Sequence, residues 1–185
     1  MTSAASLGDD ERLRLFCALT LPEKVLDTLE RWQGDQLVSG ARQVRRDQLH
    51  LTLAFLGSRP AGERGGIAAA LREAVAGVPG EIVLRPARYR ETRSVGMLVL
   101  DDEEGRATAL AEALHGRLDR LGVYRREARP WLPHVTVLRF RQPPRLRPEL
   151  PELAAFGPSG AAVYHSVLRP TGAQYEVLDS VALGG

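Results

Sequence analysis

The sequence predicts an α+β fold with two similar halves. Strand-like and amphipathic helical segments are mixed along the 185 residues, and several strand-like segments follow one another in pairs, which is typical of α+β domains. Twice, a helical segment precedes a strand that opens with His-x-Thr, and His134 follows His50 by 84 residues, close to half of the chain. We interpret this as a weak internal repeat of elements. It predicts two lobes that face each other, each a small, mostly antiparallel sheet with helices packed outside, and a cleft between them.

The individual elements follow from hydrophobic periodicity and turn residues. Thr20 and Pro22 offer a capped start for the first helix. Residues 34–47 and 142–158 are polar or proline-rich and are predicted to be irregular connections. Helices are predicted over 22–33, 63–78 and 105–122, and strands over 12–20, 49–57, 81–91, 94–102, 134–140, 161–168 and 174–183.

Composition indicates an ordinary soluble globule and excludes several other classes. Hydrophobic residues make up 44% and charged residues 26% of the chain, which argues against a disordered protein. The single cysteine, Cys17, excludes a disulfide framework and a cysteine-based zinc site, and its apolar neighbours predict a buried, inert thiol. No apolar run is long enough for a membrane span, and the N-terminus does not resemble a signal peptide. We expect a cytoplasmic monomer with a loose tail over 1–11 and one bilobal domain over 12–185.

The positive charges are nearly all arginine. The net charge is only +2, and Lys24 is the one lysine among 25 basic residues. The arginine bias is typical of genomic composition, but guanidinium groups also suit bidentate phosphate contacts, so clusters on a near-neutral chain indicate a local anion site. The clusters are Arg42, Arg45 and Arg46; Arg125, Arg126 and Arg129; and Arg139, Arg141, Arg145 and Arg147.

Two His-x-Thr triplets, His50–Thr52 and His134–Thr136, are the most informative motif. With four histidines and eight threonines in the chain, chance placement would give on the order of 0.2 such triplets. In a strand, residues i and i+2 share a face, so His and Thr should point together while Leu51, Leu53 and Phe55 face the core. The alternative for Phe55 is a place at the rim of the cleft. One such triplet would fit a half-buried strand with polar residues on its solvent face, whereas a matched pair favours a shared site.

Facing strands with these side chains suit phosphodiester chemistry. One imidazole can take a proton from water while the other gives one to a leaving alcohol. The threonine hydroxyls can donate to the nonbridging phosphate oxygens, and arginine can add positive charge. In both strands, threonine occupies the position where a second metal ligand would stand. We therefore expect no metal and no cofactor.

These motifs resemble those of the 2H phosphoesterase superfamily, and most closely the LigT-like RNA 2′,3′-cyclic phosphodiesterases of the 2′-5′ RNA ligase family. The strings LHLTLAFLG and PWLPHVTVLR resemble the first and second family motifs. A short C-terminal signature is also present, and one departure occurs at 42–44, Arg-Gln-Val, where many members have an aromatic residue. The resemblance covers residues 12–180, and the signature consists of Ser166, Leu168, Gly172, Tyr175 and Leu178.

The resemblance implies roles for particular residues. His50, Thr52, His134 and Thr136 would be catalytic, with His134 as the base on water and His50 as the acid; the sequence itself is symmetric and does not distinguish the two. Arg139 and Arg42 are predicted to bind substrate, although strict alternation places Arg139 opposite His134, so the strand must twist or end first. Trp131 is either a packing residue between the lobes or a wall on which a base stacks. The remaining histidines, His115 and His165, are predicted to be surface or hydrogen-bonded residues without a catalytic role.

Several functions remain open at this level. The leading hypothesis is hydrolysis of an RNA terminal 2′,3′-cyclic phosphate to a 2′-phosphate, with weak 2′-5′ ligation as the reverse reaction. The alternatives are a phosphodiesterase on another cyclic or 2′-5′-linked nucleotide, or a non-catalytic RNA- or nucleotide-binding module. The expected partners are RNA ends or short oligonucleotides with a cyclic phosphate, and no membrane.

Overall fold

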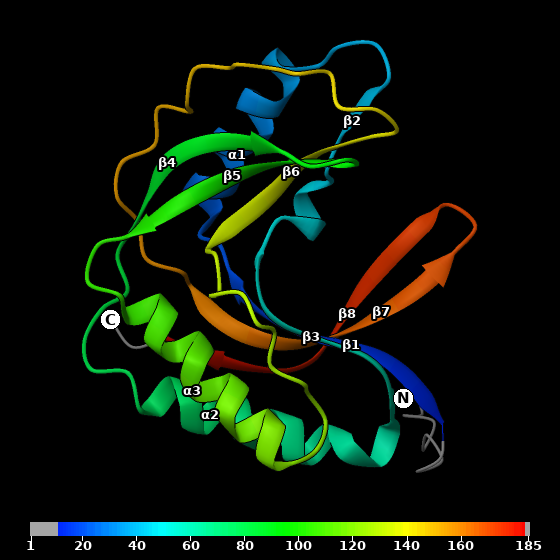
Figure 1. Cartoon of the computed structure of the whole chain (residues 1–185), viewed down its shortest axis with the longest axis vertical. Coiled ribbons are helices and arrows are strands. Elements are labelled where there is room, and N and C mark those ends of the chain that lie inside the picture. Colours follow the sequence, from blue (N-terminus) through cyan, green and yellow to red (C-terminus); the bar gives the residue numbers. More distant parts are fainter. Residues whose placement is uncertain (1–10, 184–185) are drawn as a thin grey trace, which may run out of the picture.

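The computed structural model describes residues 11–183, and the predicted tail over 1–11 lies almost entirely outside them. Two four-stranded antiparallel sheets face each other (Figure 1). Sheet A has the order β3-β1-β7-β8 and sheet B the order β2-β6-β5-β4. The strands of sheet A are β1 (Arg12–Thr20), β3 (Leu51–Pro60), β7 (Gly160–Arg169) and β8 (Gly172–Ala182); those of sheet B are β2 (Ala41–Gln43), β4 (Leu84–Glu91), β5 (Val95–Asp102) and β6 (His134–Phe140). The α+β prediction is confirmed.

The helices lie outside the sheets and cross between the two halves. Helix α1 (Glu23–Asp35) precedes β3 of sheet A along the chain but packs against β6 of sheet B. Helix α3 (Arg106–Arg120) precedes β6 but packs against β3, beside α2 (Arg64–Ala76), which covers β7 (Figure 1). Short 3₁₀ turns occupy Arg46–Gln48 and Ala61–Glu63. Each His-x-Thr strand is therefore preceded by a helix that supports the opposite sheet.

The apolar faces of both sheets and all three helices contribute to the hydrophobic core. Leu19, Leu51, Leu110 and Val135 are fully buried in it. Cys17 is also fully buried, and burial raises the pKa of its thiol to about 12, in agreement with the inert thiol expected from the sequence. Within residues 11–183, no helix has both the length and the hydropathy needed to cross a bilayer.

Two local features differ from the sequence-based prediction. The connection predicted over 34–47 contains β2, a three-residue strand that pairs with β6. A strand this short is defined by its backbone hydrogen bonds, because three residues are too few to show hydrophobic alternation in the sequence. Thr20 does not cap α1, because its hydroxyl bonds to the hydroxyl of Ser159 at 2.9 Å. The helix begins instead after Pro22, whose carbonyl accepts from the amides of Val25 and Leu26.

Both His-x-Thr strands contain a β-bulge directly after the threonine. In β3, Thr52 pairs with Ala18 and Ala54 with Cys17, so Leu53 has no partner residue in β1. In β6, Thr136 pairs with Met97 and Leu138 with Gly96, which leaves Val137 without a partner in β5. A bulge inserts one residue and shifts the alternation of side chains that follow it. The pattern H-x-T-x-x-(Phe/Arg) therefore places its first, third and sixth residues on one face.

A buried glutamine stabilises the bulge in β6. Gln33 of α1 is completely buried, and its side-chain amide donates to the carbonyls of Val137 and Val44, the latter at 3.1 Å. The Val137 carbonyl also accepts from the Val44 amide at 3.1 Å. Backbone groups that the bulge removes from the sheet ladder are thereby satisfied by α1 and by the segment after β2.

We expect Gln33→Leu to lower the free energy of unfolding by about 1–3 kcal/mol, because the Val44 carbonyl then stays buried without this donor. Urea unfolding followed by circular dichroism measures this difference. Gln142→Leu, at an exposed position, is the control and should change the free energy by less than about 0.5 kcal/mol. Equal stabilities of the two variants would contradict the role of Gln33.

Candidate active site

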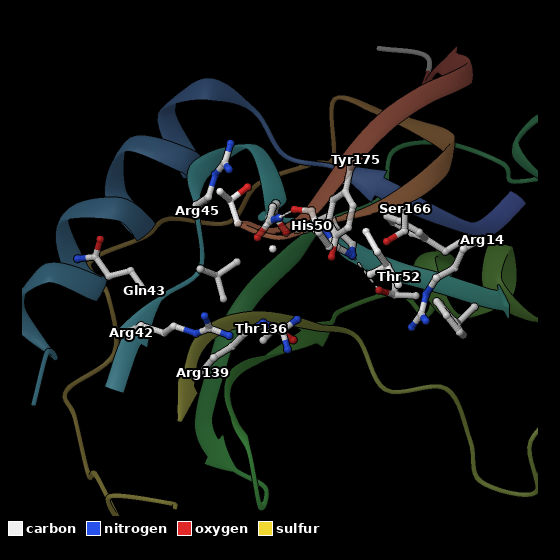
Figure 2. Close-up of a pocket in the computed structure, with 18 of the residues that line it drawn as sticks. Arg14, Arg42, Gln43, Arg45, His50, Thr52, Thr136, Arg139, Ser166 and Tyr175 are labelled. Carbon is white, nitrogen blue, oxygen red and sulfur yellow. Dashed lines mark hydrogen bonds between the residues drawn. The ribbon is translucent and has the colours of Figure 1, made fainter. Parts of the chain in front are cut away.

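The two His-x-Thr motifs meet in one cavity between the sheets. Its volume is about 580 Å³, and its lining includes His50 and Thr52 from the start of β3 and His134 and Thr136 from β6. Arg42 of β2 and Arg139 of β6 line the same cavity, and Figure 2 shows both directed toward it from the side of sheet B. The six residues predicted from the motifs and the arginine clusters are thus brought together, although their positions 42–52 and 134–139 are far apart in the sequence.

The two histidines are held in the same way. Nδ1 of His50 lies 2.7 Å from the carbonyl of Gln48, and Nδ1 of His134 lies 2.8 Å from the carbonyl of Leu132. A carbonyl only accepts, so each Nδ1 carries a proton and each neutral ring keeps Nε2 as its basic nitrogen. In β3, Nε2 of His50 accepts from the Thr52 hydroxyl at 3.0 Å, the bond dashed in Figure 2. Both rings are therefore fixed in the tautomer that proton transfer at Nε2 requires.

His50 lies among aromatic rings. Its ring centroid is 5.1 Å from that of Phe16, and Tyr175 meets it edge-on at 5.6 Å. Burial in these surroundings lowers the pKa of His50 to about 4; the Gln48 carbonyl opposes this shift, and the charges of His134 and Arg139 add to it. His50 is consequently neutral at pH 7.

The bulges decide which further side chains face the cavity. Strict alternation predicts that Phe55 points into the core, and this prediction is wrong: Phe55 is 50% exposed and lines the cavity, because the bulge at Leu53 reverses the alternation. The guanidinium of Arg14 lies 4.9 Å from the centroid of the Phe55 ring. The bulge at Val137 has the same effect in β6 and turns Arg139 to the face of His134. Strict alternation had placed Arg139 on the opposite face.

The arginine clusters separate in space. Arg45 lines the cavity but forms an ion pair with Asp47 at 2.6 Å. Arg46 has a structural role, because it forms ion pairs with three carboxylates of α1, namely Glu23, Asp27 and Glu30. Arg126 and Arg129 line a neighbouring cavity, and Arg141 lies in a third hollow beside Arg42 and Arg139.

Trp131 joins the two halves of the molecule. Its indole Nε1 donates to the carbonyl of Thr52 at 2.9 Å, and its ring lines the neighbouring cavity rather than the one that holds His50. His115, buried on α3, binds the next carbonyl of the same strand, that of Leu53, through Nε2 at 2.7 Å. His165 lies on β7, with Nδ1 3.7 Å from a carboxylate oxygen of Glu176. The prediction that His115 is hydrogen-bonded is confirmed.

The β7–β8 hairpin closes one side of the cavity. Periodicity predicts its two strands, but neither periodicity nor composition places them at the cavity. Four of the five residues of the C-terminal signature, namely Ser166, Leu168, Gly172 and Tyr175, line the cavity, while Leu178 packs against the core. The side-chain amide of Gln48 donates to the carbonyl of Ala173 and ties the hairpin to the segment before His50. Arg14 and Phe16 of β1 were also missed, since an exposed arginine and a buried phenylalanine in a strand carry no local signal of a site.

Metal-ligand groups are not assembled in the part of the chain that the structure describes. No three His, Cys, Asp or Glu side chains come together there in a way that could hold an ion. The positions next to the two histidines on the cavity face are occupied by threonine, and four further lining residues are arginines, which do not ligate cations.

This fold and this pair of motifs define a phosphoesterase-like site, and the comparison with known proteins identifies the family. The sequence model of the 2′-5′ RNA ligase superfamily matches residues 21–170, so the chain belongs to this superfamily. The family resemblance predicted from the two motifs is confirmed.

Two curated relatives are named RNA 2′,3′-cyclic phosphodiesterase. The one from Thermus thermophilus is 33% identical over 184 residues, covering 94% of this chain and 91% of the relative. The one from Escherichia coli is 32% identical over 135 residues, covering 70% and 73%. A crystal structure from T. thermophilus has a TM-score of 0.78 and 30% identity, and the match covers 92% of this chain and 98% of that one. The structure of E. coli LigT complexed with 3′-AMP has a TM-score of 0.79 and 23% identity, and the match covers 95% of this chain and 100% of that one. The latter supports the fold.

The environment of His50 generates a prediction about its protonation. We expect histidine NMR of the free protein to give His50 a pKa near 4 and to show this pKa rising when inorganic phosphate or a nucleoside 2′-phosphate is added, because an anion stabilises the imidazolium. Binding should then take up a proton, so phosphate affinity should increase as the pH falls from 7 toward 5. Loss of the signal in His50→Gln assigns it. An unshifted pKa in the presence of bound phosphate would contradict this account.

Proposed function

We propose that this chain hydrolyses the terminal 2′,3′-cyclic phosphate of RNA to a 2′-phosphate by acid–base catalysis with two histidines and without a metal. The observation that supports it most is the matched pair of imidazoles in one cavity, each tied through Nδ1 to a carbonyl so that Nε2 is the basic nitrogen. The names of the two relatives, and the 3′-AMP and ATP complexes of E. coli LigT, support a nucleotide substrate.

In the proposed reaction, water attacks phosphorus on the side opposite the 3′-oxygen. His134 Nε2 takes a proton from the water, the bond between phosphorus and the 3′-oxygen breaks, and protonated His50 Nε2 gives a proton to that oxygen. The products are a 2′-phosphate and a 3′-hydroxyl. Burial lowers the pKa of His50 and keeps it neutral at pH 7 in the free protein. The negative charge of the bound substrate would raise this pKa, so that His50 takes up the proton that it then donates.

Threonine and arginine stabilise the charge that develops on the phosphate oxygens. The Thr52 hydroxyl, bonded to His50 Nε2 at 3.0 Å, would turn to a nonbridging oxygen when the substrate occupies this position. Thr136 is its counterpart on β6, and Arg139 and Arg42 add positive charge from the same side. Run in reverse, the site would join a 5′-hydroxyl to the cyclic phosphate as a 2′-5′ linkage, a minor direction because water competes with that acceptor.

Replacement of the histidines tests the two roles separately. His50→Ala and His134→Ala should each lower kcat on a cyclic-phosphate-ended oligonucleotide by at least about a hundredfold, whereas Thr52→Ala and Thr136→Ala should cost less, since each removes one contact to the phosphate. With sulfur in place of the bridging 3′-oxygen, the leaving group needs no proton. His50→Ala should then recover much of its rate and His134→Ala should not.

His165→Ala is the matched control, because His165 lies outside the cavity, and it should retain the activity of the unmodified protein. All rates should be measured in EDTA with identification of the product isomer. Inhibition by EDTA with rescue by one divalent ion would contradict the metal-free mechanism. Rescue of His134→Ala in place of His50→Ala would reverse the two roles, and full activity of both variants on the natural substrate would refute the catalytic proposal.

A further inference from the structure

A second cavity, of about 650 Å³, adjoins the first. Thr52, Phe55 and His134 line both cavities, so the second begins where the reacting phosphate is proposed to lie. Its outer wall is the segment between α3 and β6, which passes through Arg126, Arg129 and Trp131.

Aromatic rings held in fixed positions line this second cavity. The indole of Trp131 is anchored by its bond to the Thr52 carbonyl, and Tyr124 stacks on His115 with the ring centroids 4.8 Å apart and the planes inclined by 29°. Phe55, with Arg14 beside its ring, stands at the boundary between the two cavities. Rings that keep their orientation are stacking platforms for the bases of single-stranded nucleic acid.

Three exposed arginines also line this cavity, together with two carboxylates, Glu112 and Glu127. Arg126 and Arg129 make only long contacts to carboxylates, at 3.7 Å to Glu112 and 3.6 Å to Glu127, and all four side chains are more than half exposed. Such pairs contribute little to stability and can be exchanged for a phosphate. Arg90 of β4 forms no ion pair with any other residue in the range 11–183.

We propose that the second cavity binds the nucleotides on the 5′ side of the cyclic phosphate, so that the protein prefers oligonucleotides to mononucleotides; this rests on the function proposed above. A cyclic phosphate ends the RNA at its 3′ side, so the rest of the strand leaves the catalytic cavity in a single direction. The second cavity adjoins the catalytic one at Thr52, Phe55 and His134, and it offers both aromatic rings and arginines to a strand that leaves through it. The hollow beside Arg42, Arg139 and Arg141 offers arginines, but its one aromatic residue, Phe140, is buried.

The test compares a mononucleotide with a longer substrate. We expect kcat/KM for a tetranucleotide with a 2′,3′-cyclic phosphate to exceed that for adenosine 2′,3′-cyclic phosphate. The double variant Arg126→Ala/Arg129→Ala should lower the tetranucleotide value roughly tenfold and leave the mononucleotide value unchanged, because the lost contacts lie beyond the terminal nucleotide. The dependence of tetranucleotide KM on salt should weaken at the same time, since fewer counterions are released.

Arg90→Ala, on a different element, should also lower kcat/KM for the tetranucleotide alone. This variant provides the test if the double variant folds poorly. Arg141→Ala is the matched control and should affect neither substrate. A selective loss in Arg141→Ala, or equal kcat/KM for both substrates in the unmodified protein, would overturn this inference while the proposed hydrolysis still stands. Absence of turnover on both substrates would instead refute the proposed function itself.

Discussion

The arrangement of the site depends on how the outer edge of β3 is covered. β3 is the terminal strand of sheet A, so its outer carbonyls have no neighbouring strand to bind. Trp131, from the segment that leads into β6, and His115, from α3, donate to two successive carbonyls there, those of Thr52 and Leu53. The Trp131 bond fastens the first His-x-Thr strand to the segment that leads into the second, and the His115 bond fastens it to α3. Both bonds lie at the bulge that sets the direction of Phe55.

The two His-x-Thr strands share a bulge after the threonine but differ in the residue that the bulge turns toward the cavity. Both present histidine, threonine and a third side chain on one face, and the third is Phe55 in β3 but Arg139 in β6. The two bulges therefore direct an aromatic ring into the cavity from sheet A and a guanidinium from sheet B. His50 lies among Phe16 and Tyr175, whereas Arg139 lies on the strand of His134 in sheet B. Arg14 of sheet A is a further arginine in the lining. An approximate repeat therefore places two histidines in distinct environments.

Much of the fold and the core of the site could be predicted from the sequence. Apolar periodicity located most of the strands and helices, and the rarity of paired His-x-Thr triplets identified the four central residues. The parts that were missed depend on non-local contacts. Strand β2 exists because β6 pairs with it, and the bulge at Val137 is stabilised by Gln33 from a distant helix. Strict alternation contains no information about such a bulge, so it misplaced Phe55 and left Arg139 on the opposite face.

The position of the β7–β8 hairpin at the cavity also depends on non-local contacts. Tyr175 and Ser166 reach the cavity because β7 pairs with β1, next to β3, and Gln48 binds the Ala173 carbonyl. A family signature could single these residues out, whereas hydrophobic patterning could not, since they alternate in strands like any others. Local sequence therefore singles out the two histidines that we propose to react, and the tertiary structure adds their orientation.

The central claim is that both imidazoles flank a single phosphate. A crystal structure of the protein with a nucleoside 2′-phosphate tests it most directly. Our account predicts phosphate oxygens at hydrogen-bond distance, roughly 3 Å, from Nε2 of His50 and of His134, with a threonine hydroxyl on each side. A phosphate held by Arg42 and Arg139 alone, with the two Nε2 atoms more than about 10 Å apart, would contradict it, because imidazoles that far apart could not flank one phosphorus atom.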